Sequence, residues 1–183
     1  DEILNGDIHT ANQRLAGLES RNQAKTFIYA LIYGAGDEKI GTVVGGNKAD
    51  GRRLRESFLN NLPSFRTLIY KVSRAATKGF LKGLDGRKIK VRSQHSALNA
   101  LLQGGGAIVM KKALMIFHEE IQQYGAVVVA NIHDEWQVEV PWQHADEVGK
   151  AGVRAIIQAG KDLELKCPLD GEYKIGANWS ETH

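Results

Sequence analysis

The stretch from Ser20 to Gly34 constrains the fold of this chain most strongly, because it carries the signals of a complete helix. It reads S-R-N-Q-A-K-T-F-I-Y-A-L-I-Y-G. Ser20 and Gln23 have the three-residue spacing of a capping box, which predicts a helix start. Tyr33 and Gly34 are followed by a second glycine, Gly36, which predicts the helix end. The inner face of this helix is predicted from the apolar residues Phe27, Ile28, Leu31 and Ile32.

The opposite face of the predicted helix carries Arg21, Lys25 and Tyr29. These residues are four positions apart, so they lie on one side of an α-helix. A guanidinium offers a planar set of donors to phosphate oxygens, and an ammonium offers a compact charge. A phenol can stack on a ring or donate a hydrogen bond. The spacing therefore indicates a surface for a polyphosphate attached to a flat group. A solvated helix face without a ligand is the alternative.

Composition places the chain among ordinary globular proteins. Its 183 residues suffice for one large domain or two small subdomains with a core, and 25% of them are charged. The formal net charge of +3 permits a nucleic-acid partner without requiring one. The single cysteine, Cys167, excludes an internal disulfide and a Cys-rich zinc site. We find no signal-peptide pattern and no apolar run of membrane-spanning length. The missing initiator Met indicates a fragment or a processed product.

Further helices and a hairpin are predicted after Gly34. A short helix is predicted at residues 39–44, and two charged surface helices at 48–61 and 64–79. The Asp85-Gly86 pair predicts a hairpin tip. Its lysines and arginines suit either contact with a phosphate backbone or a strand edge kept soluble by charge.

The longest helical pattern runs from residue 96 to 122. Asn99 and Gln103 are four residues apart on it, so they could contact base edges or bridge groups within the protein. Gly104, Gly105 and Gly106 interrupt the apolar pattern, at a cost of about 1 kcal/mol each relative to alanine. Such a run predicts that another backbone approaches the helix closely.

Two strands with an acidic turn are predicted next. Residues 126–130 form a continuous apolar run typical of a buried strand, and 136–140 alternate as in a half-buried strand. His133, Asp134 and Glu135 lie between them. Adjacent carboxylates repel each other, and a divalent cation such as Mg²⁺ relieves that repulsion. A solvated turn is the alternative. We predict a further helix at 144–161 and a final strand at 173–179.

Three of these patterns together resemble motifs of one family. Arg21, Lys25, Tyr29, Tyr33 and Gly34 form R-x-x-x-K-x-x-x-Y-x-x-x-Y-G, which resembles motif B of family A DNA polymerases. The triplet H-D-E at 133–135 resembles their motif C, and N-x-x-x-Q at 99–103 resembles their helix that contacts the minor groove. The words L-I-Y-G-A-G-D-E-K-I-G and L-D-G-R-K are most similar to replicative polymerases of short-tailed lytic phages. The resemblance covers residues 1–183.

The resemblance implies roles for the helix residues. Arg21 and Lys25 would hold the triphosphate of an incoming dNTP, and Lys25 would also protonate the leaving pyrophosphate as a catalytic residue. His9 matches a phosphate-contacting histidine of the family. Tyr29 would pack on the dNTP sugar, and a tyrosine here implies tolerance of dideoxynucleotides.

The resemblance also implies catalytic and DNA-binding roles elsewhere. Asp134 would bind two Mg²⁺ ions, whose second carboxylate ligand lies outside this chain, and Glu135 would assist catalysis. His133 would lie near the primer end, and Tyr33 and Gly34 beside the templating base. Minor-groove acceptors common to all correct base pairs would be contacted by Asn99 and Gln103.

The fold implied is α+β, the C-terminal part of a right-hand polymerase. Residues 1–88 would form a helical fingers portion. Residues 89–183 would form a palm portion, whose small antiparallel sheet carries Asp134 and packs on helices 96–122 and 144–161. The expected partners are primer–template DNA, dNTPs and an upstream polymerase segment, with a processivity factor as a further candidate. No membrane partner is expected, and the expected location is the cytoplasm of a phage-infected bacterial cell.

One departure from the family pattern limits the expected activity. No segment resembles motif A, which supplies the second metal-binding aspartate of the family. We therefore expect a DNA-directed DNA polymerase that is active only with an upstream part. Two alternatives stay open: a non-catalytic DNA- or nucleotide-binding accessory module derived from a polymerase, and a fragment of a single-subunit RNA polymerase. The RNA polymerases carry H-D-S in place of H-D-E and lack the middle tyrosine.

Overall fold

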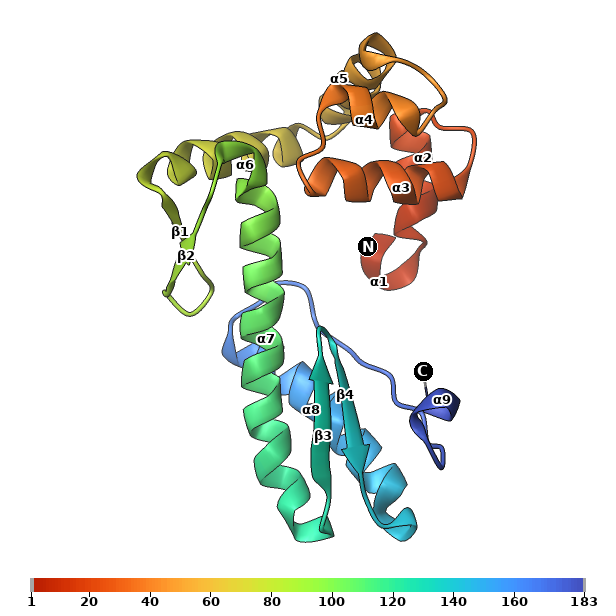
Figure 1. The fold of residues 1–183 in the computed structure, drawn as a ribbon, viewed down its shortest axis with the longest axis vertical. Coiled ribbons are helices and arrows are strands. Elements are labelled where there is room, and N and C mark those ends of the chain that lie inside the picture. The colour runs from red at the N-terminus through yellow and green to blue at the C-terminus, as the bar shows by residue number, and fades with distance from the viewer. Residues whose placement is uncertain (1, 183) are drawn as a thin grey trace. The chain divides into compact units, whose positions relative to one another are not determined.

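A computed structural model describes residues 2–182, and they divide into two compact units. The first unit comprises the residues up to 81 together with 88–102. The second comprises residues 82–87 together with those from 103 onward. The long helix α7 (Ala97–Ile121) contributes to both units (Figure 1).

The first unit is built from helices. These are α1 (Glu2–Asn5), α2 (Ile8–Ala16), α3 (Arg21–Ile32), α4 (Asp37–Thr42), α5 (Lys48–Asn61) and α6 (Pro63–Ala75), with a 3₁₀ turn at Ala76–Lys78. The helices predicted from residue 20 to 79 are confirmed, whereas α1 and α2 were not predicted from their polar sequence. Caps explain α2: Asp7 accepts a hydrogen bond from the N–H of His9, and Gly17 ends the helix in the left-handed conformation.

The core of the first unit lies beneath α3. Phe27 and Phe58 meet edge to face, with 5.1 Å between their ring centroids, and both are buried. Leu31 and Ala24 of α3 are buried in the same cluster, which confirms the predicted inner face. α5 crosses α4 closely, because a side-chain carbon at Gly51 would lie 1.8 Å from the carbonyl oxygen of Asp37. This crossing therefore requires a glycine.

A small hairpin and a second cluster complete this part of the chain. β1 (Phe80–Lys82) pairs with β2 (Lys88–Lys90), so the hairpin predicted from the Asp-Gly signal is confirmed. The Lys88 ammonium lies 4.8 Å from the centre of the Phe80 ring, a cation–π contact. Buried residues of the hairpin and its neighbours form the second cluster, which includes Val72, Leu81, Val91 and Leu98.

The second unit consists of a strand pair packed on two helices. β3 (Val127–Ile132) pairs antiparallel with β4 (Glu135–Glu139), and α8 (Ala145–Asp162) follows; a short helix, α9 (Trp179–Thr182), comes last (Figure 1). Phe117 and Ile121 of α7 are buried with Val148, Ala151 and Ala155 of α8. Val128, Trp136 and Val138 of the strands pack on this cluster. The predicted α+β fold, with an antiparallel sheet on these helices, is confirmed.

Two predictions about the strands are wrong. β3 is not a buried strand: Val127 is 58% exposed and Val129 is 60% exposed, because helices cover only the opposite face. Residues 173–179 do not form a strand. Side chains hold this segment instead: the Tyr173 hydroxyl donates to Asp146 of α8 at 2.6 Å, and the Tyr173 ring fills the space above Gly149.

α7 also departs from expectation. At two of the three glycines no backbone of residues 2–182 comes close: a side-chain carbon at Gly105 would meet only a side-chain carbon of Leu84 at 3.7 Å, and one at Gly106 would have no neighbour within 4 Å. By length and hydropathy alone, the region Gln94–Tyr124 would suffice to cross a membrane, in contrast to the sequence analysis. Ala97 and Phe117 on this helix are buried in the cores of the two units.

The packing boundary differs from the predicted functional boundary. Residues 89–102 pack with the first unit, although the sequence analysis assigned them to the palm portion. The reason is the cluster of Val91, Ala97 and Leu98 against Val72 of α6. The assignment of residues 1–88 to fingers and 89–183 to a palm stays a prediction about function.

Candidate functional site

The helix start predicted at Ser20 is present with both halves of its capping box. The Ser20 hydroxyl accepts the N–H of Gln23 at 3.2 Å, and the Gln23 side chain accepts the N–H of Ser20 at 3.2 Å. α3 buries Ala24, Phe27 and Leu31, which orients the helix. Arg21, Lys25 and Tyr29 consequently lie on its exposed side, and Tyr29 is 49% exposed. The predicted set of three therefore forms one accessible surface.

Arg21 has a carboxylate partner that the sequence analysis missed. Asp7 Oδ2 lies 2.6 Å from Arg21 Nε, and Asp7 Oδ1 lies 3.3 Å from Arg21 Nη2. The Arg21 guanidinium, together with the Thr10 hydroxyl, holds the pKa of the Asp7 carboxyl well below its usual range. The available sequence signal was an aspartate just before a helix, the pattern of an N-cap.

His9 lies two residues after Asp7, in the first turn of α2. It is half-buried, and its Nδ1 atom is shielded from solvent without a hydrogen-bond partner among residues 2–182. Its backbone N–H donates to Asp7 Oδ1 at 3.0 Å. Asp7 thus links the start of the helix that carries His9 to the start of the helix that carries Arg21.

Tyr33 and Gly34 form the end of α3. Tyr33 is 52% exposed. Gly34 has a φ of 76°, and a side-chain carbon there would lie 2.2 Å from the backbone oxygen of His95. Both the left-handed conformation and this close approach require a glycine. Gly34 therefore has a structural reason within the first unit, beside any contact with a template.

Asn99 and Gln103 lie one turn apart on α7, as predicted. Asn99 is half-buried, and its Oδ1 atom is shielded from solvent with no hydrogen-bond partner in the described part of the chain. Gln103 is exposed. Their common side of α7 also carries Gly106, which has open space before it. At Gly106 this side of the helix is therefore not covered by the described residues.

The acidic turn lies at the tip of the β3–β4 hairpin. Ile132 pairs with Glu135, so His133 and Asp134 alone make the connection. His133 has a φ of 55°, an uncommon conformation for a residue with a side chain. Asp134 is exposed. Glu135 is half-buried, and its carboxylate accepts a hydrogen bond from Gln137, the next residue on that face of β4.

Trp136 anchors the hairpin to the helices. Its ring stacks on Phe117 of α7, with 5.0 Å between ring centroids and an interplanar angle of 14°. The two helices are joined by the ion pair of Lys112 with Asp162 at 3.0 Å and by that of Arg154 with Glu120. The acidic turn next to Trp136 is therefore carried by a packed support.

A complete metal site is not formed by residues 2–182, because no three His, Cys, Asp or Glu side chains among them come close enough to hold an ion. The donors present still suit Mg²⁺. This ion is commonly bound through one or two carboxylates together with substrate phosphates. The exposed carboxylate of Asp134, next to Glu135, fits one half of such a set.

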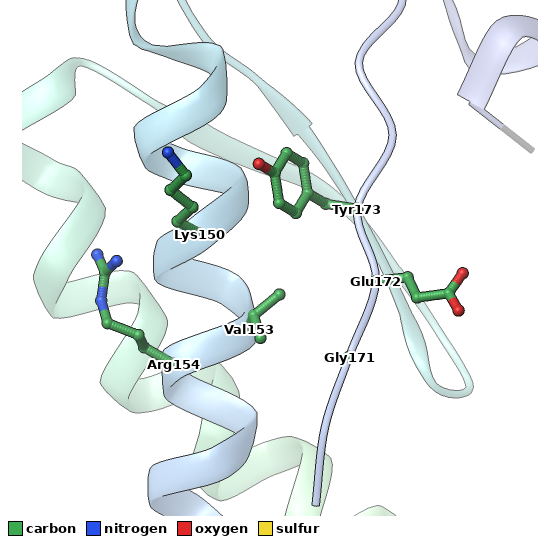
Figure 2. A pocket seen from close by; sticks show the side chains of 6 residues that line it. All are labelled: Lys150, Val153, Arg154, Gly171, Glu172 and Tyr173. Carbon is green, nitrogen blue, oxygen red and sulfur yellow. The ribbon is translucent and has the colours of Figure 1, made fainter.

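One hollow of the second unit involves none of the predicted site residues. It lies between α8 and the segment 171–173 and has a volume of about 620 Å³ (Figure 2). Two of its lining cations are already paired, Lys150 with Asp146 and Arg154 with Glu120. The hollow therefore offers no free charged group from these two residues to a ligand.

Comparison with known proteins decides the family. The family model described as DNA polymerase family A matches residues 4–181. The chain belongs to DNA polymerase family A. All of the chain aligns with the DNA-directed DNA polymerase of Escherichia phage Phieco32 at 42% identity and with that of Escherichia phage T7 at 39% identity. These alignments cover 31% and 29% of the two relatives.

More distant members of family A match as well. DNA polymerase I of Aquifex aeolicus is 30% identical over 89% of the chain and 30% of its own length. Among solved structures, the POL domain of Pol1 from M. smegmatis, in complex with DNA primer-template and dNTP, superposes with a TM-score of 0.75. The two proteins share 20% sequence identity. The superposition covers 84% of this chain and 31% of the chain of the M. smegmatis protein. The predicted phage-type family A resemblance is confirmed, whereas the roles of single residues stay predictions.

Proposed function

We propose that this family A chain is part of a template-directed DNA polymerase that adds dNTPs to a primer 3′ end by two-metal phosphoryl transfer. Because the chain spans about 30% of its phage relatives, we propose that an upstream segment bearing motif A completes the catalytic site. The observation that carries the proposal is the exposed row of Arg21, Lys25 and Tyr29 on α3, in a chain matched by the family along residues 4–181.

α3 supplies the contacts to the incoming dNTP in this proposal. The Arg21 guanidinium donates to triphosphate oxygens, and the Lys25 ammonium neutralises part of the triphosphate charge. Lys25 also transfers a proton from Nζ to the pyrophosphate oxygen that is released from the α-phosphorus. His9 donates to a phosphate oxygen, and Tyr29 packs its ring on the sugar. The exposed placement of Lys25 and Tyr29 supports these roles.

The hairpin supplies the carboxylates. Asp134 would hold the Mg²⁺ ions together with the upstream aspartate, and Glu135 would orient ligands around them. The bound ions would promote deprotonation of the primer 3′-hydroxyl and neutralise charge on the phosphates. Two residues connect the strands, and Trp136 is stacked on Phe117, so Asp134 is held on a rigid support.

DNA would be contacted by the remaining site residues. Asn99 and Gln103 would donate to minor-groove acceptors. Tyr33 and Gly34 would lie beside the templating base, and His133 near the primer end. That the structural neighbour was solved with DNA primer-template and dNTP supports both ligands as partners here.

Primer extension tests the proposal directly. The chain would be assayed alone, and mixed with the upstream part of a phage family A polymerase that carries motif A, with Mg²⁺ or EDTA. We expect extension only in the mixture with Mg²⁺. Extension by the chain alone would show that the second carboxylate has been misplaced in this proposal.

The accessory-module alternative differs from the main proposal in what it expects of the same assay. It predicts that the mixture binds primer–template but does not extend it. The RNA polymerase alternative gains no support from the relatives, which are DNA polymerases. Ribonucleotide and deoxyribonucleotide substrates in the same extension assay would separate it from the main proposal.

A further inference from the structure

The carboxylate of Asp7 is the most heavily used polar group near the proposed triphosphate contacts. It accepts the His9 N–H at 3.0 Å and the Thr10 hydroxyl at 2.8 Å, both within the first turn of α2. It also accepts Nε and Nη2 of Arg21 at 2.6 Å and 3.3 Å. One side chain thus joins the starts of two helices that carry two of the proposed phosphate-binding residues.

Asp7 is held more firmly than Arg21 is. The cap contacts fix the carboxylate to the backbone of α2, independently of Arg21. Arg21 has a long side chain that is 52% exposed, and such a side chain loses considerable rotamer freedom when a ligand orders it. Within residues 2–182, Asp7 is the carboxylate that forms an ion pair with Arg21. The fixed partner therefore determines where the guanidinium lies.

The geometry also leaves donors available to a ligand. A guanidinium has five N–H donors, and the contact through Nε and Nη2 occupies two of them on one edge. Both N–H groups of Nη1 and the second one of Nη2 lie on the other edges of the plane. A phosphate group can therefore accept from Arg21 while the ion pair to Asp7 persists.

We propose that Asp7 is a positioning residue, which orders the Arg21 guanidinium in advance so that its remaining N–H donors meet the triphosphate of the incoming nucleotide. This inference rests on the proposed function of Arg21 and adds Asp7 to it. Ordering Arg21 beforehand removes part of the entropy cost of binding. Asp7 does not touch the substrate, and its effect passes through Arg21.

An opposing electrostatic effect has to be separated in the test. A carboxylate close to a triphosphate repels it, so loss of the Asp7 charge alone would strengthen binding, most clearly at low salt. A positioning role predicts the opposite change, because loss of the Asp7 carboxylate would then weaken triphosphate binding. The two effects therefore give different outcomes for one variant, Asp7→Asn, whose amide oxygen caps helices about as well as a carboxylate.

The experiment measures binding of inorganic tripolyphosphate and of dATP to the 183-residue chain by calorimetry, at low and at physiological salt. Arg21→Ala is expected to abolish or greatly weaken binding, which tests the proposed function. Asp7→Asn is expected to raise the Kd by about three- to ten-fold at both salt concentrations. Asp7→Asn is expected to have no further effect in the Arg21→Ala background, and little in Arg21→Lys, because lysine has no planar fork to orient.

The matched control is Asp50→Asn, which changes another capping aspartate that pairs with a nearby arginine, Arg53. It should leave the Kd unchanged, and thermal melts should show that every variant folds. An unchanged or lower Kd for Asp7→Asn, with Arg21→Ala defective, would overturn the positioning role alone. An equal loss in the Arg21→Ala background would also overturn it, and unaltered binding by Arg21→Ala would overturn the function proposed for Arg21.

Discussion

α3 and the β3–β4 hairpin carry the two halves of the proposed chemistry, and they differ in how completely this chain supports them. α3 closes its first turn with its own capping box and buries Ala24, Phe27 and Leu31 in the first core. The hairpin packs one face on α7 and α8, but Val127 and Val129 on its other face are about 60% exposed. A helix satisfies its backbone internally, whereas a strand pair leaves edges and a face to be covered. Within the described residues, α3 is therefore capped and packed on its inner side, whereas one face of the β3–β4 hairpin stays exposed.

The largest expected effect concerns the hairpin. Asp134→Ala in the mixture of this chain with an upstream polymerase part should lower the extension rate by about 10³-fold, because it removes the carboxylate that is proposed to bind the metal ions. Single-turnover primer extension measures it. Asp170→Ala, which removes an exposed carboxylate elsewhere in the second unit, is the control. A normal rate for Asp134→Ala would disprove the metal assignment.

The unequal support of the two regions can be tested by stability. Phe27→Ala should lower the free energy of unfolding of the first unit by about 3–5 kcal/mol, because the ring is fully buried beneath α3. Val127→Thr should change the free energy of unfolding of the second unit by less than about 0.5 kcal/mol, because the Val127 side chain faces solvent. Urea denaturation of the chain alone measures both. A large loss for Val127→Thr would show that residues of this chain already cover the outer face.

The end of α3 gives a smaller effect. Gly34→Ala should destabilise the first unit by about 2 kcal/mol or more, because it combines a φ of 76° with a clash against the His95 oxygen. Gly106→Ala is the matched control in α7, where nothing lies within 4 Å, and it should stabilise by up to about 1 kcal/mol. Equal effects of the two changes would refute the close approach at Gly34.

The smallest effect concerns acid stability near α3. The pKa of Asp7 is lowered in the folded chain by Arg21, so its ionised form favours folding. This contribution is complete above the unfolded pKa of about 3.9 and is lost as the pH falls below it toward the folded value. Thermal melts between about pH 5 and 2 should therefore show a shallower decline of Tm for Asp7→Asn than for the original chain. The same slope in both would mean that the Asp7–Arg21 pair does not form in solution.

Local sequence determined the elements whose signals are short in range. The capping box of Ser20 and Gln23, the Asp85-Gly86 hairpin tip and the strand–turn–strand at 127–139 all appear where the patterns predicted them. Each depends on hydrogen bonds or periodicity within a few residues. The shared face of Arg21, Lys25 and Tyr29 could also be predicted from the sequence, because residues four positions apart lie on the same side of a helix.

Contacts between distant residues could not be read in this way. The pairing of Asp7 with Arg21 joins residues 14 positions apart, and no periodicity connects them. The predicted strand at 173–179 does not form. Its Tyr173 instead donates a hydrogen bond to Asp146 and packs its ring over Gly149, both on α8. β3 was predicted to be buried because its residues are apolar. Apolar residues favour burial, but whether a strand is buried depends on which other segments pack against it.

The sequence by itself therefore determined the family motifs, the α+β class and most of the helices and turns, since these follow from local spacing and backbone preferences. Only the tertiary structure decided that Asp7 holds Arg21, that Gly34 lies against His95, and that one face of β3 stays open. The physical reason is that hydrogen bonds between distant side chains, close backbone approach and burial are set by packing of the whole chain, to which local patterns contribute only weakly.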